Sequence, residues 1–393
     1  MRASFGAYIG PWEQEFSVGR SLVSSISMLS FLIFAIGQPL AGKLNDRFGR
    51  GVVPTAGIFI MGASLLLLSL AVQLWQVFVL FGVVFSLGYA ACTSSIPVAI
   101  ISNWFVKKRG FALGLVMAGF AVGQLILVPA NLFFVSSAGW KTTMAVLGVI
   151  IMAGVGALFL LLLRSKPEEK GLRPYGYSET SEDILPAGRA APEGSRSLPL
   201  LSVVKMRVFW QLAIPYFICG FTDSGVIQTH LIPIAEGKGL PVSSVALAFI
   251  LIAIANIAGT ILTGHLSDHF SRTRQLAIIY SLRAVTYVFL IALDQPGLLL
   301  VFALIYGITE MASIAPTNSL TIQSFEGFSI GAILGLVTVS HHIGGAIGSW
   351  IPGLVYDLTG SYYPVLVLAI IMLSCGALIA LRIPEKKIGG VKI

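Results

Sequence analysis

Several ionisable side chains lie within long apolar stretches of the sequence, where a charge is costly. The carboxyl groups are Asp223 and Glu310, and the basic groups include His230, Arg283 and His341. Such groups usually face the interior of a helix bundle, where a carboxyl or histidine carries a proton and an arginine holds an anion. These residues are therefore the first candidates for proton or anion binding.

Asp223 and His230 are seven residues apart, about two helical turns, so a regular helix places them on one face. For His230 the alternative is a hydrogen-bonded histidine near the outer surface, because Pro233 and a loop follow closely. Tyr89 adds a polar group at membrane depth, and the alternative for it is a bond to a neighbouring backbone carbonyl.

Glu310 has two interpretations that the sequence leaves open. Its carboxyl group either carries a proton or forms an ion pair with Arg283 of the adjacent helix. For Arg283 itself a structural role is favoured. His341 and His342 are adjacent, so at most one of them faces a cavity.

The elements that position these groups are membrane-spanning helices. Hydrophobic residues make up 56% of the 393 residues and charged residues only 11%, against about a quarter in soluble domains. The sequence predicts an all-α membrane protein with eleven complete spans. They lie near 21–41, 52–73, 77–101, 110–134, 142–163, 208–233, 245–263, 275–293, 298–316, 329–352 and 364–382.

Basic residues are concentrated on alternate loops. Twenty of them fall on one side and three on the other, while Arg2 and Arg283 fall at membrane depth. This bias predicts that the basic side is cytoplasmic. The net charge of +8 therefore reflects topology and does not predict nucleic-acid binding.

The three cysteines, Cys92, Cys219 and Cys375, lie in apolar spans without paired spacing. They are interpreted as small core residues, and no disulfide or metal site is predicted. The sequence has no recognisable catalytic set, phosphate loop or dinucleotide fingerprint, so no cofactor is predicted.

The chain contains an internal repeat. GKLNDRFGRG at 42–51 and GHLSDHFSRTR at 264–274 place Asp46 and Asp268 222 positions apart, and other residues match at that offset. We predict two six-helix bundles related by a pseudo-two-fold axis, at 1–164 and 208–393. A cytoplasmic linker rich in Pro, Gly, Ser and charge joins them at 165–207.

GKLNDRFGRG resembles the signature loop of the major facilitator superfamily, and NWFVKKRGFALGLVMAGFAVG is similar to the next cytoplasmic loop and helix in its monocarboxylate porter and oxalate/formate exchanger branch. The resemblance implies a charged latch that holds an inner gate shut. Glycine permits close approach of helix and turn, and the aspartate can cap a neighbouring helix N-terminus. The latch residues are Gly42, Asp46, Arg47, Gly49, Arg50, Gly264, Asp268 and Arg272.

The resemblance also implies a secondary transporter that works by alternating access. The cation excess at membrane depth favours a small organic anion, of the monocarboxylate or dicarboxylate type, moved with a proton or in exchange. Candidate substrate and proton groups are Arg2, Tyr89, Asp223, His230, Arg283, Glu310 and His341. Porters of that branch carry an arginine in the eighth span, where this chain has Asn256 and Thr260.

The alternative function is proton-coupled efflux of hydrophobic or cationic compounds, which the latch and carboxyl groups also permit. A membrane-embedded enzyme or receptor is disfavoured, because neither a catalytic constellation nor a sensor domain is found. We expect a monomer in the lipid bilayer of a bacterial inner (cytoplasmic) membrane, with protons and a small anionic substrate as its partners.

The repeat also bears on the start of the chain. At the 222-residue offset Met1 falls opposite Asp223, in the middle of the seventh span, which begins near Val208. The plan is therefore twelve helices with the first one truncated. An upstream extension of at least 14 mostly apolar residues is predicted.

Overall fold

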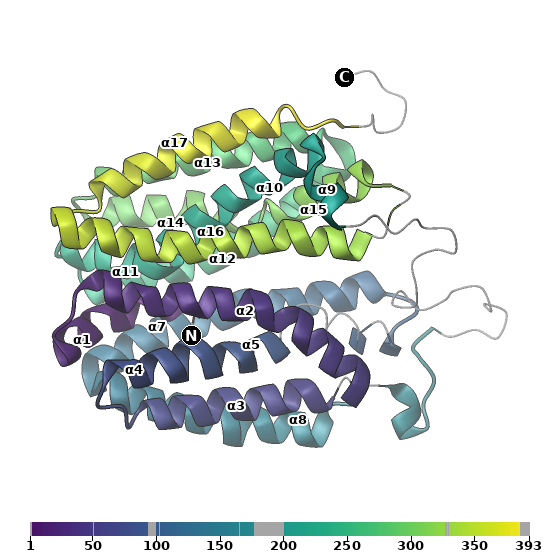
Figure 1. Ribbon diagram of the computed structural model, residues 1–393, viewed down its shortest axis with the longest axis horizontal. Coiled ribbons are helices and arrows are strands. Elements are labelled where there is room, and N and C mark those ends of the chain that lie inside the picture. The colour runs from purple at the N-terminus through teal and green to yellow at the C-terminus, as the bar shows by residue number, and fades with distance from the viewer. Residues whose placement is uncertain are drawn as a thin grey trace. The chain divides into compact units, whose positions relative to one another are not determined.

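A computed structural model describes residues 2–49, 51–92, 100–101, 103–164, 166–176, 200–326, 328 and 330–385, and nearly all of them lie in helices (Figure 1). The regular helices are α1 (Gly6–Phe16), α2 (Arg20–Phe48), α3 (Val52–Leu68), α4 (Leu74–Val77), α5 (Ser86–Cys92), α7 (Arg109–Val149), α8 (Ala157–Leu162), α9 (Leu200–Val204), α10 (Arg207–Gly220), α11 (Gln228–Gly237), α12 (Val242–His269), α13 (Arg272–Ile291), α14 (Pro296–Glu310), α15 (Ile314–Ser324), α16 (Ile330–Thr359) and α17 (Tyr363–Ala380).

Shorter segments of a different helical pitch interrupt or join these helices. Two are 3₁₀ turns, η1 (Arg2–Ser4) and η4 (Pro167–Lys170). Three are π-helices that continue a neighbouring α-helix: η2 (Phe78–Phe85), η3 (Ile150–Gly156) and η5 (Phe221–Ile227). Because a π-helix closes its hydrogen bonds one residue later, it rotates the following side chains relative to a regular α-helix.

The all-α membrane fold is confirmed. Within the described residues, eight helical stretches are long and apolar enough to cross a membrane, and the shorter apolar helix α3 covers a further predicted span. Two predicted spans, 110–134 and 142–163, lie on one continuous stretch that bends at Gly139, where φ is +79°. The predicted span at 208–233 is formed jointly by α10, η5 and α11.

Contacts between Cα atoms group the chain into two compact units. Unit 1 comprises residues 1–28, 121–133 and 191–393, and unit 2 comprises residues 29–120 and 134–190. The bundle boundaries at 164 and 208, with the linker between them, remain a prediction.

Within unit 1, glycines bring α16 against α10 and η5. A Cβ added at Gly344 would lie 2.1 Å from the carbonyl oxygen of Phe217, and one at Gly348 would lie 2.3 Å from that of Phe221. No side chain fits at these distances, so the two helices touch through their backbones. Small residues four positions apart on one helix allow this close approach of two backbones.

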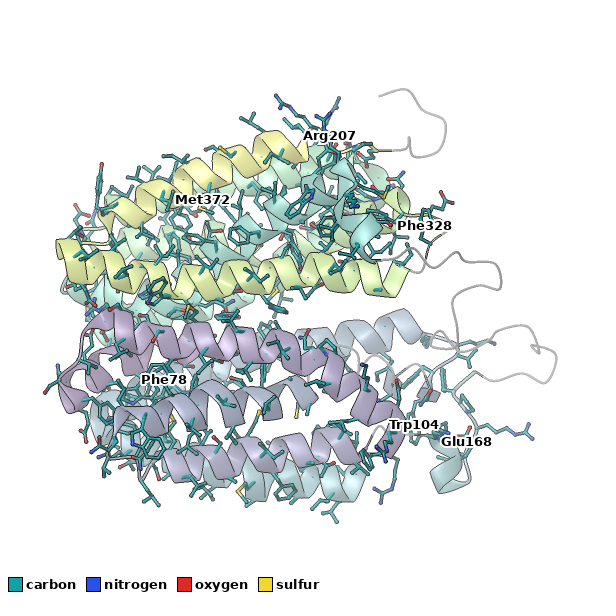
Figure 2. All side chains as sticks on the ribbon, viewed as in Figure 1. Phe78, Trp104, Glu168, Arg207, Phe328 and Met372 are labelled. Carbon is teal, nitrogen blue, oxygen red and sulfur yellow. The ribbon has the colours of Figure 1, made fainter. Side chains whose placement is uncertain are left out.

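Unit 2 packs α3 against α5 in the same way, since a Cβ at Gly57 would lie 2.7 Å from the carbonyl oxygen of Gly88. Phe78 and Trp104 of this unit lie toward opposite ends of its helices (Figure 2). At one end the Nε1–H of Trp104 donates to the carbonyl oxygen of Arg164 at 2.9 Å. The segment before α7 is thereby tied to the segment after α8.

Candidate functional site

Glu310 is the last residue of α14, where the helix ends at membrane depth and the chain turns before α15. Its side chain is 2% exposed. The Nδ2–H of Asn256 donates to one carboxylate oxygen at 2.7 Å, and the Nε2–H of Gln124 donates to the other at 3.3 Å. Thr260 donates in turn to Asn256 at 3.1 Å. Neutral amides therefore hold this carboxyl group.

Arg283 lies on α13 and is fully buried. Its Nη2 donates to the carbonyl oxygens of Thr309 and Glu310, and its Nη1 donates to Cys219 Sγ at 3.0 Å. The last carbonyls of a helix have no partner within the helix and carry partial negative charge. Arg283 therefore caps the carboxyl end of α14.

The ion pair that the sequence offered as one interpretation does not form. Within the described residues no salt bridge joins Arg283 to the Glu310 carboxylate, because the guanidinium contacts the backbone of Glu310. This leaves the carboxyl group available for a proton, which was the other interpretation.

Asp223 lies in η5 and is 4% exposed. One of its carboxylate oxygens accepts the hydroxyl proton of Tyr306. Cys219 Sγ, a carboxylate oxygen of Asp223 and a ring nitrogen of His341 lie within 4.8 Å of one another. The structure therefore gathers two of the predicted residues, together with a cysteine that the sequence interpretation assigned to the core.

His341 lies on α16, and its ring centroid is 4.7 Å from that of Tyr216. The charges of Asp223, Arg283 and Arg2 all act on this imidazole. Arg2 belongs to η1 at the start of unit 1. The predicted candidates Arg2, Asp223, Arg283, Glu310 and His341 thus belong to one electrostatic neighbourhood within unit 1.

The ring of His230 is held by hydrogen-bond partners, the kind of environment described by the alternative interpretation of this residue. Its ring is fully buried, with Nδ1 3.0 Å from the Tyr362 hydroxyl and Nε2 2.7 Å from the carbonyl oxygen of Ser349. The π-helix at 221–227 rotates the chain between Asp223 and His230, so seven residues no longer amount to two regular turns. The two side chains therefore have separate partners.

Tyr89 lies on α5 in unit 2. Its ring stacks on Phe34 at 4.9 Å and on Phe85 at 6.4 Å. These contacts place its ring against two buried aromatic side chains.

A cluster that the sequence did not single out surrounds Arg20, the first residue of α2. Its guanidinium donates to the Glu13 carboxylate at 2.7 and 3.0 Å and to the Tyr362 hydroxyl at 3.2 Å, and it lies 3.9 Å above the Tyr356 ring. Asp357 accepts the backbone N–H groups of Arg20 at 2.9 Å and Ser21 at 2.8 Å. We call these residues, Glu13, Arg20, Tyr356, Asp357 and Tyr362, the outer cluster, because the charge pattern predicts this end to be outside.

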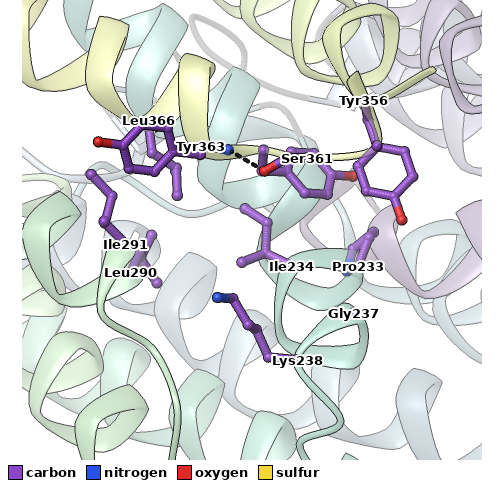
Figure 3. Close-up of a pocket in the computed structure, with 12 residues that line it drawn as sticks. Pro233, Ile234, Gly237, Lys238, Leu290, Ile291, Tyr356, Ser361, Tyr363 and Leu366 are labelled. Atoms are coloured by element: carbon purple, nitrogen blue, oxygen red, sulfur yellow. Dashed lines mark hydrogen bonds between the residues drawn. The ribbon is translucent and has the colours of Figure 1, made fainter. Parts of the chain in front are cut away.

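A pocket of 140 Å³ adjoins the outer cluster (Figure 3). Lys238, Ser361 and Tyr363 line it together with the cluster residues Tyr356 and Tyr362. The backbone N–H of Tyr363 donates to the Ser361 hydroxyl at 3.1 Å, which fixes the turn before α17 (Figure 3).

The first copy of the latch motif lies at the end of α2. Asp46 and Arg47 are exposed, and Gly49 has a φ of +93°, a conformation that favours glycine. The close approach expected at Gly42 is not found, since a Cβ there would meet no described atom within 4 Å. Arg50 lies outside the described residues.

The second copy of the motif joins α12 to α13. Gly264 is as uncrowded as its counterpart, and the side chain of Asp268 lies outside the described residues. At the start of α13 the backbone N–H of Arg272 donates to Glu385 at 2.8 Å, and the Ser271 hydroxyl donates to Glu385 at 2.7 Å. A carboxylate does cap a helix N-terminus here, but it comes from the segment after α17.

The family model for the major facilitator superfamily matches residues 1–333 and, in a second overlapping match, residues 219–392. The chain belongs to the major facilitator superfamily. It is therefore an integral, multi-pass membrane transporter for a small molecule, as the family and its apolar helices show.

Three relatives that carry different names are similar in sequence over most of this chain. The chain is 27% identical to the uncharacterized MFS-type transporter YcxA of Bacillus subtilis, over 97% of this chain and 90% of that protein. It is 23% identical to monocarboxylate transporter 12 of Rattus norvegicus, over 89% and 74% of the two chains. It is 24% identical to the agnestins efflux protein AgnL12 of Paecilomyces divaricatus, over 89% and 76%.

The fold is similar to a solved transporter structure, the bacterial homolog of the human lysosomal transporter Spinster in its inward-facing, unoccupied conformation. The TM-score is 0.72 at 17% identity, and the match covers 97% of this chain and 93% of that one. This likeness concerns the fold alone.

Proposed function

We propose that this transporter moves a small organic anion, of the monocarboxylate or dicarboxylate type, by alternating access, with proton symport or anion exchange. The observation that carries the proposal is the buried Glu310 carboxyl group, which lies close to Arg283 yet is held by the neutral amides of Asn256 and Gln124. The similarity to monocarboxylate transporter 12 supports the substrate class.

Glu310 is the proposed proton carrier. A side-chain amide offers either an N–H donor or a carbonyl acceptor, so Asn256 and Gln124 can bond both the ionised and the protonated carboxyl group by turning over. An ion pair with Arg283 would instead fix the ionised form. The contacts of Glu310 therefore suit a group that gains and loses a proton in each cycle.

Arg283 is the proposed anion-binding cation. Its Nε–H is buried and has no hydrogen-bond partner among the described residues, although both Nη atoms are engaged. Where porters of the related branch carry an arginine in the eighth span, Asn256 of this chain bonds Glu310. Arg283 of α13 supplies the positive charge from a different helix, with Arg2 and His341 as additional basic groups.

The remaining parts of the proposal concern architecture. The two six-helix bundles at 1–164 and 208–393 rock around the central site, and the latch from Gly42 to Arg50 closes the cytoplasmic side. The second copy, with Gly264, Asp268 and Arg272, contributes less because His269 and Ser271 replace Arg47 and Gly49 of the first. We propose that the protein works as a monomer in a bacterial inner membrane.

The test is uptake of labelled lactate, pyruvate, formate and oxalate into proteoliposomes, with and without a pH gradient. Glu310→Gln should abolish accumulation driven by the gradient and retain exchange, since exchange needs no net protonation cycle. Glu236→Gln, at an exposed carboxylate of α11, is the matched control and should accumulate substrate normally. Absence of uptake for every carboxylate would exclude this substrate class.

The second candidate function is proton-coupled efflux of hydrophobic or cationic compounds. The similarity to the efflux protein AgnL12 favours it, as do the buried carboxyl groups of Asp223 and Glu310. Extrusion of a cationic dye from cells that lack other pumps, lost in Glu310→Gln, would support efflux in place of anion transport.

A further inference from the structure

The side chains of Cys219, Asp223 and His341 converge at the centre of unit 1. Cys219 and Asp223 are one helical turn apart on the α10 and η5 stretch, and His341 comes from α16. One potential ligand atom from each lies within 4.8 Å of the other two. Thiolate, carboxylate and imidazole are together the ligands of zinc and of similar divalent transition metals.

We propose that Cys219, Asp223 and His341 form a binding site for a divalent transition metal ion of the Zn²⁺ type. The proposal does not depend on the organic-anion substrate, because it concerns only what these three side chains bind.

The backbone fixes the distance between the two helices that carry the ligands. A Cβ at Gly220 would lie 1.9 Å from the carbonyl oxygen of His341, so the backbones of α10 and α16 are in direct contact beside the site. Zn–S and Zn–N or Zn–O bonds of about 2.3 and 2.0–2.2 Å place tetrahedral ligand atoms roughly 3.5 Å apart. The three ligand atoms, which lie within 4.8 Å of one another, must approach by at most about 1.3 Å to reach that spacing.

The hydrogen bonds around the cluster leave the ligand positions open. Arg283 Nη1 donates to Cys219 Sγ at 3.0 Å, the Ser313 hydroxyl oxygen lies 3.4 Å from the same sulfur, and the Tyr306 hydroxyl donates to a single oxygen of Asp223. The other oxygen of Asp223 and both ring nitrogens of His341 make no hydrogen bond within the described residues. Hydrogen-bond partners like Arg283 and Tyr306 orient the ligands of a metal and are part of most metal sites.

The charges also balance. A thiolate and a carboxylate neutralise the two positive charges of the ion, and ionised Glu310 offsets Arg283. When the ion binds, the Cys219 thiol releases its proton to solvent, so affinity falls at lower pH. With three protein ligands, a fourth position remains for water or a bound anion.

The test uses the full chain, purified without an oligohistidine tag, and titrated with Co²⁺ followed by competition with Zn²⁺. We expect one site with the d–d bands of tetrahedral Co²⁺ and a near-ultraviolet thiolate-to-cobalt charge-transfer band. Cys219→Ser should remove the charge-transfer band. Asp223→Asn and His341→Gln should each weaken binding at least about 10-fold.

Two controls separate this site from other ligands in the chain. His265 and His269 lie one turn apart on α12 with ring centroids 4.8 Å apart, and they offer a competing site. The double variant His265→Gln/His269→Gln and the variant Cys375→Ser should both retain the charge-transfer band. A size-exclusion profile of each variant should match that of the wild-type protein, which checks that the variant is folded.

Three outcomes would overturn the proposal: no Co²⁺ binding by the folded wild-type protein, a charge-transfer band that persists in Cys219→Ser, or loss of the band in the His265/His269 variant. A Zn²⁺-dependent rise in thermal stability that Cys219→Ser abolishes is an independent readout in its favour.

Discussion

Replacing Arg20 with lysine tests how strongly the outer cluster stabilises unit 1. Lysine keeps the positive charge but loses the planar fork that bonds Glu13 twice and lies over the Tyr356 ring. The change therefore separates guanidinium geometry from charge. We expect Arg20→Lys to lower the free energy of unfolding.

The magnitude follows from the contacts that lysine cannot replace. The side chains of Arg20 and Glu13 are 15% and 20% exposed, so their ion pair is partly screened and is worth about 1 kcal/mol, near the upper end of exposed pairs. The contact of Arg20 with the Tyr356 ring at 3.9 Å adds about 0.5–1 kcal/mol. Since lysine retains part of the ion pair, the expected loss is about 1–1.5 kcal/mol.

The assay is thermal and denaturant unfolding of the purified protein in one detergent. Arg274→Lys, at an exposed arginine of α13, is the matched control and should change stability by less than about 0.5 kcal/mol. A double-mutant cycle of Arg20→Lys with Glu13→Gln should give a coupling energy of about 0.5–1 kcal/mol.

If Arg20→Lys is as stable as Arg274→Lys, or if the coupling to Glu13 is zero within error, the outer cluster contributes nothing measurable. The contacts of Arg20 would then be consequences of packing.

Three further predictions test other parts of the chain. Asp46→Asn should reduce transport strongly at normal abundance, and Asp268→Asn should reduce it less; wild-type transport rates in Asp46→Asn would exclude the latch. Gly348→Ala should cost about 1–3 kcal/mol of unfolding free energy through overpacking, whereas Gly335→Ala, with open space around it, should not be destabilising; equal melting temperatures would contradict the backbone contact. Burial opposes ionisation of Glu385, but hydrogen bonds from the helix it caps outweigh that effect and set its pKa below the ordinary value. Its stabilisation, about 1 kcal/mol, should therefore be present above the usual glutamate pKa and lost as the pH falls through the lowered one; a difference between wild type and Glu385→Gln that does not shrink in acid would refute this.

The fold could be predicted because membrane spans depend on length and apolar composition, both of which are visible in the sequence. Each predicted span overlaps described helices; the span 52–73 is covered up to Leu68 by the short helix α3, and the span 77–101 lies partly outside the described residues. Side-chain direction was predicted less well. The pairing of Asp223 with His230 assumed a regular helix, whereas Asp223 lies in the π-helix at 221–227, which ends before His230.

Partners of the buried groups were the least predictable feature. Gln124 and Asn256 are ordinary amides in the sequence, and only the packing of distant helices brings both to Glu310. Cys219 lies one helical turn from Asp223, but the third member of the cluster, His341, comes from another helix, and the sequence does not show that the two helices meet there. Lone polar residues at membrane depth in several spans were the available clue.

The end of α14 inside unit 1 explains why Arg283 and Glu310 must be tested differently. A helix that ends at membrane depth exposes carbonyl groups that water cannot reach, and Arg283 satisfies those of Thr309 and Glu310. Removing Arg283 leaves these carbonyls unpaired, so a loss of transport in Arg283 variants would not distinguish anion binding from loss of the helix end. Glu310→Gln keeps the side-chain shape and its amide partners, and the carbonyl cap is untouched. A transport defect in that variant at normal stability therefore reports on the proton, whereas equal destabilisation of both variants would mean that the carboxyl group is structural.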